Sequence, residues 1–164
     1  HLDNVSETND TPQMETVDLL DVAKECVERQ KMNAQKSFIS LTYLGESAPV
    51  LGSRSLLDEL CQNLCDNAIR YNRPGGKVQL ITACTRDGHC TLTVKDNGIG
   101  IPKEAQSSVF ERFYRVDKSR SKATGGTGLG LSIVKHIVDC HNGTISLRSE
   151  LGHGTEITLL LPEK

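Results

Sequence analysis

The sequence predicts a two-layer α+β sandwich, in which three main helices cover one face of a mixed, mostly antiparallel sheet of about five strands. Three observations lead to this fold class. Segments with helical periodicity and segments with strand periodicity fall into separate groups along the chain. The central strand segments place apolar residues at every second position, which is typical of a sheet covered on one side. The chain has 164 residues, 37% of them hydrophobic, which is enough for one domain with its own core.

The chain is predicted to consist of a linker at residues 1–16 and one domain at residues 17–164. The linker is expected because the first residues are polar and acidic. A helix follows over residues 17–32, with Thr16 or Asp18 as its N-terminal cap and apolar side chains along one side.

The next elements alternate between strands and a second helix. A strand is expected over residues 38–44, and the short apolar stretch 49–51 could pair with it. The second helix is expected over residues 55–71, where Asn63 and Asn67 lie one turn apart on a polar stripe.

Strand signals dominate the chain after the Pro74-Gly75-Gly76 break. Residues 78–85 and 90–96 predict a hairpin, because Asp87-Gly88 between them is a strong two-residue turn. Residues 97–127 are expected to form a loop with a short helix, and residues 128–140 a strong helix that Asn142-Gly143 ends. Two last strands are expected over residues 144–149 and 156–161.

Composition excludes several classes of protein. No run approaches the roughly 18 apolar residues that span a bilayer, and no secretory pattern is present. The net charge of −2 disfavours a dedicated nucleic-acid binder. None of the six cysteines forms a CxxC pair, so we expect free thiols in a reducing cytosol rather than a metal site or a disulfide.

Two glycine-rich segments are the candidates for ligand binding. They are Asp96-Asn97-Gly98-Ile99-Gly100-Ile101-Pro102 and Gly125-Gly126-Thr127-Gly128-Leu129-Gly130-Leu131. The phosphate-loop and dinucleotide-binding patterns are both absent. Glycines allow a ligand to approach the backbone, and the second segment leads into a helix start, which suits phosphate. An ordinary turn is the simpler explanation of either segment alone.

The loop between these segments is basic. It carries five cationic side chains between residues 112 and 122 and only one acid, Asp117. A basic loop beside a glycine-lined helix start suits a polyphosphate, although a solvated charged loop explains it about as well. Phe110 and Phe113 are expected to anchor this loop as a lid, and core filling is the alternative.

Four blocks in order resemble the N, G1, F and G2 boxes of sensor histidine kinases. They are the helix segment from Glu59 to Tyr71, the Asp96 segment, Phe110-Glu111-Arg112-Phe113-Tyr114-Arg115, and the segment from Gly126 to Leu131. Within that family, the four blocks look like those of membrane-anchored kinases of the phosphate-sensor type. The resemblance implies the Bergerat ATP-binding fold that gyrase, Hsp90 and MutL share, with an ATP lid.

The resemblance also assigns roles by position. It implies that the Asp96 carboxylate accepts a hydrogen bond from the adenine amino group, and that Asn67 is the ligand of Mg²⁺. Arg70 and Tyr71 are expected near the phosphates. The whole ATP-binding set is then Asn63, Asn67, Arg70, Tyr71, Asp96, Gly98, Gly100, Ile101, Phe113, Arg115, Gly126, Thr127, Gly128, Leu129, Gly130 and Leu131.

Two residues are implied to be catalytic. Asn63 stands where relatives that hydrolyse ATP carry a glutamate base; asparagine cannot take a proton at neutral pH, so transfer to a side chain is favoured over hydrolysis. Arg115 matches a lid arginine that stabilises the transferring γ-phosphoryl group.

The resemblance implies partners that this sequence does not contain. None of its five histidines lies in the H-E/D-x-x-x-P block that such kinases phosphorylate. The acceptor is therefore expected on a separate dimerisation domain of the same protein, with a cognate response regulator downstream. This part of the chain is expected to be a cytoplasmic monomer within a membrane-anchored homodimer. A serine kinase of the anti-sigma-factor kind and a non-catalytic nucleotide-binding module are the alternatives.

Overall fold

The computed structural model describes residues 13–110 and 131–164. Its main element is a five-stranded sheet with the strand order β2-β4-β5-β7-β6, in which β2 runs parallel to β4 and the other neighbours are antiparallel. The strands of this sheet are β2 (Ser40–Gly45), β4 (Lys77–Cys84), β5 (His89–Asp96), β6 (Thr144–Glu150) and β7 (Gly154–Pro162).

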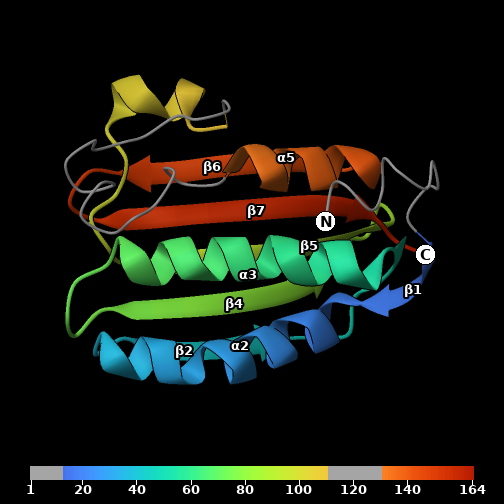
Figure 1. Ribbon diagram of the computed structural model, residues 1–164. Coiled ribbons are helices and arrows are strands. Elements are labelled where there is room, and N and C mark those ends of the chain that lie inside the picture. Colours follow the sequence, from blue (N-terminus) through green and yellow to red (C-terminus); the bar gives the residue numbers. More distant parts are fainter. Residues whose placement is uncertain (1–12, 111–130) are drawn as a thin grey trace, which may run out of the picture.

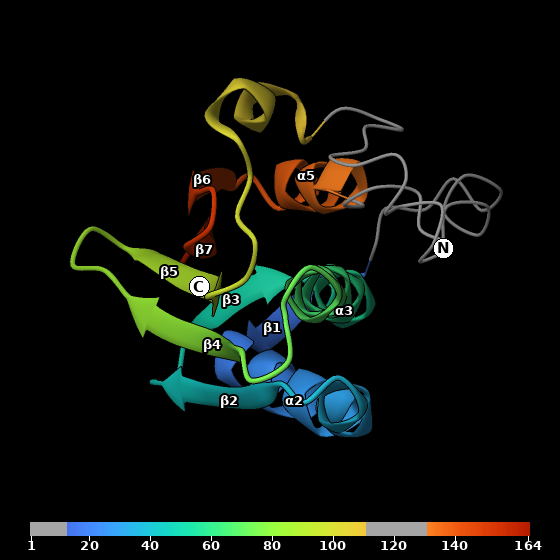
Figure 2. The ribbon, with the colours of Figure 1, turned by 90° about the vertical axis from the view of Figure 1, so that its left-hand side faces the viewer.

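Three helices lie side by side on one face of the sheet, as Figures 1 and 2 show. They are α2 (Leu19–Lys36), α3 (Arg54–Arg70) and α5 (Leu131–Cys140). Their apolar sides and the alternate apolar residues of the strands form one core, in which Leu60, Leu80, Leu92 and Leu159 have no exposed surface beyond 1%. The predicted fold class is therefore confirmed.

The first elements of the chain differ from the predicted ones. Glu15–Asp18 forms the strand β1, so the first helix begins at Leu19 rather than at residue 17, and strand pairing extends into the segment predicted as linker. Asp18 is the cap, because its carboxylate accepts a hydrogen bond from the Leu20 N–H at 2.9 Å. The same carboxylate accepts from the Ala48 N–H at 2.8 Å.

The predicted pairing of residues 49–51 with residues 38–44 is wrong. The strand β3 (Pro49–Gly52) pairs with β1 in a separate two-stranded sheet, antiparallel, with Val17 opposite Val50. Phe38 lies outside β2, since its backbone turns into the left-handed region (φ 59°) to leave α2 and its side chain is exposed. Sequence periodicity gave no sign of β1, because the strand is short and its pairing partner β3 follows only after α2 and β2 in the chain.

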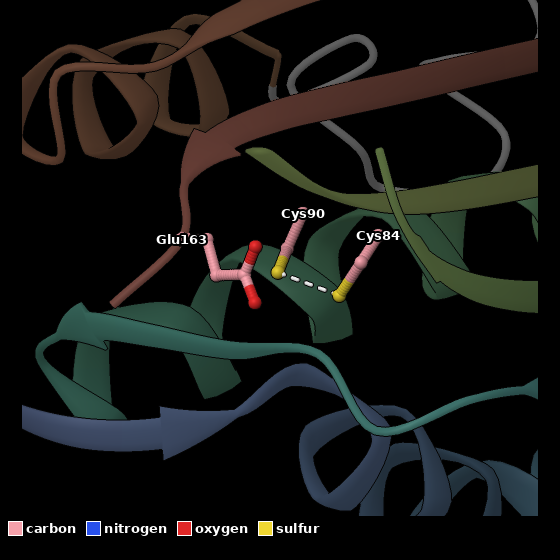
Figure 3. A group of neighbouring side chains, drawn as sticks. All are labelled: Cys84, Cys90 and Glu163. Atoms are coloured by element: carbon pink, nitrogen blue, oxygen red, sulfur yellow. Dashed lines mark hydrogen bonds between the residues drawn. The ribbon is translucent and has the colours of Figure 1, made fainter. Parts of the chain in front are cut away.

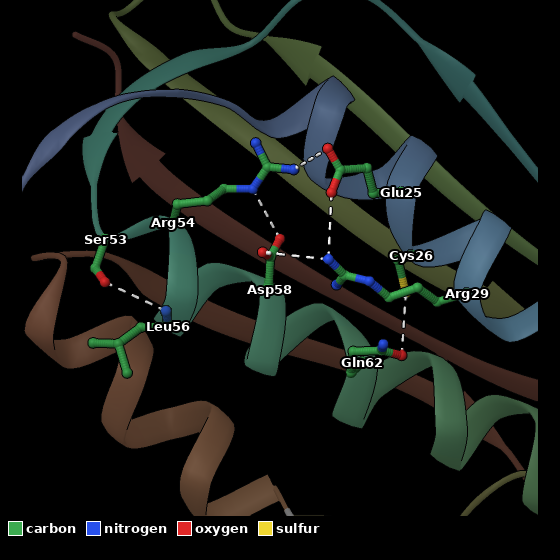
Figure 4. A network of polar contacts seen from close by, with 8 residues as sticks. All are labelled: Glu25, Cys26, Arg29, Ser53, Arg54, Leu56, Asp58 and Gln62. Atoms are coloured by element: carbon green, nitrogen blue, oxygen red, sulfur yellow. Dashed lines mark hydrogen bonds and ion pairs between the residues drawn. The ribbon is translucent and has the colours of Figure 1, made fainter. Parts of the chain in front are cut away.

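The helices α2 and α3 pack against each other through buried apolar side chains. Charged side chains form a rim beside this contact, as Figure 4 shows. Arg54 donates to Glu25 at 2.8 Å and to Asp58 at 2.9 Å, while Arg29 contacts both acids at 3.4 and 4.0 Å. Ser53 caps α3 by accepting from the Leu56 N–H at 3.3 Å. The side chains of this rim are partly exposed, so its ion pairs are expected to add little to stability.

The hairpin β4–β5 forms as predicted, with Gly88 at φ 87° in its turn. At its other end, the last residue of β5 is Asp96, which lies opposite Thr155 of β7. The following segment crosses to the short 3-10 helix η1 (Lys103–Ser108). Among the helices of the described residues, none has the length and apolar composition needed to cross a bilayer.

Candidate functional site

A mostly apolar cavity opens between α3, the end of β5, the segment after it and the start of β7. Asp96 is its one acidic lining residue. Its lining is Leu64, Asn67, Ala68, Tyr71, Val94, Asp96, Ile99, Gly100, Ile101, Leu131, Thr155 and Ile157. Apolar walls around a single charged acceptor suit a flat heteroaromatic ring that carries an N–H donor.

The position of Asp96 follows from strand pairing. It ends β5 next to Thr155, and its carboxylate accepts hydrogen bonds from the Gly98 N–H at 2.8 Å and from the backbone N–H of Thr155. Burial raises its pKa to about 6, because the two N–H groups only partly replace the lost hydration. The carboxylate is therefore ionised at neutral pH and retains acceptor capacity towards the cavity.

Gly98 and Gly100 hold the segment after β5 close to the rest of the site. The Ile99 N–H donates to the Tyr71 carbonyl at 3.1 Å, which ties this segment to the end of α3. A Cβ on Gly98 would lie 2.5 Å from the Tyr71 oxygen, and one on Gly100 would lie 2.2 Å from the Glu150 oxygen. Glycine is thus required at both positions, because a neighbouring backbone oxygen occupies the place of any Cβ atom.

We expect Gly98→Ala to destabilise the domain by about 1–3 kcal/mol, because its methyl group must displace backbone at the Tyr71 carbonyl. The matched control is Gly75→Ala, where a Cβ meets nothing within 4 Å and only the positive φ of 87° opposes it. Urea unfolding of both variants measures the difference. Equal stability losses would show that the close approach at Gly98 has no cost of its own.

The structure brings part of the predicted site together. Asn67, Tyr71, Asp96, Gly100, Ile101 and Leu131 line the cavity, and Gly98 binds the Asp96 carboxylate. Asn63 lies one turn before Asn67 on α3 but does not line the cavity. Arg70 is turned towards Asp66, with which it forms an ion pair at 3.0 Å, and both belong to a different hollow between α3 and the end of α2.

The remaining predicted residues lie outside the described part of the chain. They are Phe113, Arg115, Gly126, Thr127, Gly128, Leu129 and Gly130.

Sequence reasoning missed several residues of the cavity wall. Thr155 is the most informative, because it lies directly opposite Asp96 and donates to it. Its position could have been found only from the pairing of β5 with β7. The other missed residues are apolar and read as ordinary core positions in the sequence: Leu64, Ala68, Val94, Ile99 and Ile157.

The lining of this cavity suits a purine base. A carboxylate accepts from an amino group at the six-position of adenine and repels the oxygen that guanine carries there. The buried Asp96 carboxylate among apolar walls therefore fits an adenine nucleotide.

Comparison with known proteins gives the family. Residues 52–164 match the histidine kinase-, DNA gyrase B- and HSP90-like ATPase family, and the chain belongs to it. The sensor-like histidine kinase SenX3 of Mycolicibacterium smegmatis is 47% identical over 156 residues, which cover 93% of this chain and 40% of that protein. SenX3 of Mycobacterium tuberculosis is 43% identical over 152 residues, covering 92% of this chain and 37% of that protein.

Solved structures of histidine kinases have the same fold as this chain. The mycobacterial sensor histidine kinase MprB superposes with a TM-score of 0.80 at 31% identity, over 93% of this chain and 99% of that one. The chain is a catalytic ATP-binding domain of the sensor histidine kinase class. It spans less than half of the length of the SenX3 proteins.

Proposed function

We propose that this domain binds Mg²⁺-ATP in the cavity at Asp96 and passes the γ-phosphoryl group to a histidine on a separate dimerisation domain. The observation that carries the proposal is the buried carboxylate of Asp96 at the end of β5, held by the N–H groups of Gly98 and Thr155. Because apolar side chains surround this carboxylate, the partner that fits it is a planar ring that carries an N–H donor.

In this proposal the residues of the domain bind and orient. Asp96 selects adenine, while Ile99, Ile101 and Ile157 contact the ring faces. Asn67 is placed at the cavity wall and would hold Mg²⁺ through its side-chain oxygen. When bound, ATP supplies the transferable group, and Mg²⁺ neutralises charge on the phosphate oxygens.

The position one turn before Asn67 bears on the reaction class. Asn63 has no proton-accepting side chain, so a water molecule near the γ-phosphate gains no general base from this position of α3. This supports transfer to an acceptor over hydrolysis. Arg70 would have to leave its ion pair with Asp66 to contact a phosphate. From the sequence resemblance, Arg115 would stabilise the transferring group, and Phe113, Thr127, Leu129 and the glycines 126, 128 and 130 would form the lid around it.

The wider protein is proposed from its relatives, which are named as sensor kinases and are longer than this chain. We propose a membrane-anchored homodimer in which this domain is cytoplasmic and serves a cognate response regulator. The domain itself is proposed to be monomeric and to bind no nucleic acid, in keeping with its net charge of −2.

Calorimetric titration with ATP and GTP, with and without Mg²⁺, tests the proposal. We expect saturable binding of ATP at one site, a response to Mg²⁺, and at least tenfold weaker binding of GTP, from the loss of one charged hydrogen bond. A folded sample that binds neither nucleotide would contradict it. Adding an acceptor helix then decides the target, because phosphohistidine is acid-labile and the phosphoserine of the alternative serine kinase is acid-stable.

Asn67→Ala is expected to weaken nucleotide binding about tenfold in the presence of Mg²⁺ and little in its absence, because only the metal-bound form uses the Asn67 oxygen. Asn33→Ala on the exposed side of α2 is the matched control and should change neither value. Equal losses with and without Mg²⁺ would show that Asn67 acts by shaping the cavity and not as a metal ligand. Isothermal titration in magnesium buffer and in EDTA makes the comparison.

A further inference from the structure

Two cysteines face each other across the hairpin β4–β5, at the end of the sheet opposite to Asp96 (Figure 3). Cys84 and Cys90 are register partners, and their Sγ atoms lie 3.0 Å apart. Thr85 donates to the His89 carbonyl at 2.8 Å, so the 85/89 pair is hydrogen-bonded and the 84/90 pair is not. Side chains in a non-hydrogen-bonded pair come closest together.

The distance between the sulfurs favours bond formation over a shared metal ion. Two thiolates on one tetrahedral zinc ion, each about 2.3 Å from it, stand about 3.8 Å apart. The observed 3.0 Å is shorter than that, and a disulfide of about 2.05 Å is reached by a further approach of about 1 Å. Glu163 offers an oxygen within 4.8 Å of both sulfurs, so a metal site is the competing occupant of the same place.

The two thiols differ in their surroundings. Cys90 is fully buried and its Sγ contacts the Pro49 carbonyl at 3.6 Å, whereas Cys84 is partly exposed and its Sγ contacts the Ser47 carbonyl at 3.4 Å. Burial, with Cys84 and Glu163 nearby, raises the pKa of Cys90 to about 12. Cys84 is thus the thiol that solvent reaches, and Cys90 is held beside it as a protonated second thiol.

We propose that Cys84 and Cys90 are a reversible oxidation site that a peroxide converts into a cross-strand disulfide. The Cys84 sulfur attacks one oxygen of hydrogen peroxide, the O–O bond breaks, and a sulfenic acid forms as one water leaves. The Cys90 sulfur then displaces the hydroxyl group from Cys84: the S–S bond forms, the S–O bond breaks, and the Cys90 proton leaves with the hydroxyl as a second water. A dithiol reverses the step and is itself oxidised to its disulfide.

The site is independent of the proposed function. Asp96 is six residue steps along β5 from Cys90, which at about 3.3 Å per step is roughly 20 Å, and Val94, the first residue of β5 that lines the cavity, is four steps or roughly 13 Å away. Oxidation therefore leaves the cavity intact, and nucleotide affinity of the oxidised domain should stay within twofold of the reduced value. A loss of more than tenfold on forming the disulfide would overturn this separation.

Peptide mapping after peroxide treatment tests the proposal on the unmodified protein. Trypsin cuts at Arg86, between the two cysteines, so the disulfide would join peptide 78–86 to peptide 87–95. We expect this linked pair, a fall from six free thiols to four, and full recovery with dithiothreitol. Cys140→Ser, which removes the exposed cysteine of α5, is the control and should form the link as the wild type does.

Two results would overturn the proposal. One is oxidation of Cys140 or of Cys84 alone, to sulfinic acid, with no linked peptides. The other is stoichiometric binding of added zinc that blocks alkylation of Cys84 and Cys90 together, which would make the cluster with Glu163 a metal site. Cys84→Ser and Cys90→Ala, each checked by thermal melting, should both keep their five remaining thiols free after the same peroxide treatment; a loss of two thiols, restored by dithiothreitol, in either variant would place the bond elsewhere.

Discussion

Asp96→Asn is expected to weaken ATP binding by 10- to 100-fold and, at neutral pH, to make the empty domain more stable. The binding loss follows because an amide is a poorer acceptor than a carboxylate, and a hydrogen bond to a charged group is worth about 1.5–3 kcal/mol. The stability gain follows because burial removes water from the Asp96 carboxylate and its two hydrogen bonds only partly compensate for this loss, which raises its pKa to about 6. Asparagine keeps the acceptor for the Gly98 N–H without that charge.

The sign of the pH dependence follows from the same carboxylate. The folded state holds the Asp96 proton up to about pH 6, whereas the ordinary value for the unfolded chain is 3.8. The folded state therefore binds more protons between these values, and the stability of the wild type falls as pH rises through this window. The advantage of Asp96→Asn should be absent below about pH 4 and reach a plateau above about pH 6.

Thermal melts from pH 3.5 to 8 and calorimetry with ADP measure the two effects. Asp139→Asn, an exposed carboxylate paired with Lys135 on α5, is the control and should change neither the cavity nor the pH profile. ADP affinity of the wild type should fall below about pH 6, and that of Asp96→Asn should fall less steeply. An Asp96→Asn variant with wild-type affinity would remove Asp96 from adenine recognition.

His141→Ala is expected to lower the free energy of unfolding by about 2–4 kcal/mol, which for a domain of this size lowers Tm by roughly 5–15 °C. His141 is buried after the end of α5 and joins two elements: its Nδ1 donates to the Ile137 carbonyl at 2.8 Å, and its Nε2 accepts from the Ser53 N–H at 3.0 Å. Alanine leaves the buried Ser53 N–H without this acceptor and opens a void beside Gly52.

Differential scanning calorimetry of His141→Ala and of His136→Ala checks this. His136 lies on the same helix with an exposed side chain, so its removal should cost less than about 0.5 kcal/mol. If both variants melt together, the bridge from α5 to Ser53 contributes nothing measurable.

The sequence predicted the elements that have strong local signals. The apolar stripe of α3, the Asp87-Gly88 turn and the Asn142-Gly143 stop are local chemistry, and each stands where expected. The strand β1 was missed because four residues carry no usable period and its partner β3 is distant in the chain. The extension of α2 from residue 32 to Lys36 was missed because its last turn is polar except for the buried Ala34.

The residues of the candidate site likewise fall into those that a local pattern predicts and those that depend on distant parts of the chain. The segment that holds Asp96 and Gly98 was predictable because a strand end followed by glycines is a local pattern, whereas the role of Asp96 followed from the family resemblance. The structure explains Gly98 by its close approach to the Tyr71 carbonyl. Thr155 was not, because its contact with Asp96 depends on the register of β7 against β5. Nor could periodicity show that Arg70 faces Asp66, since helical spacing places a side chain on a face and not on a partner.

The pairing of Asp96 with Thr155 has a consequence for synthesis of the protein. The strand β7 comes after β2, β4, β5 and β6 in the sequence, and it lies between β5 and β6 in the sheet. A ribosome-bound chain that ends before β7 has made Asp96 but lacks both its Thr155 donor and the strand that joins β5 to β6. Until β7 emerges, such a nascent chain cannot form the cavity at Asp96, because part of the cavity wall is Thr155 and Ile157 and depends on the long-range pairing of β7 with β5.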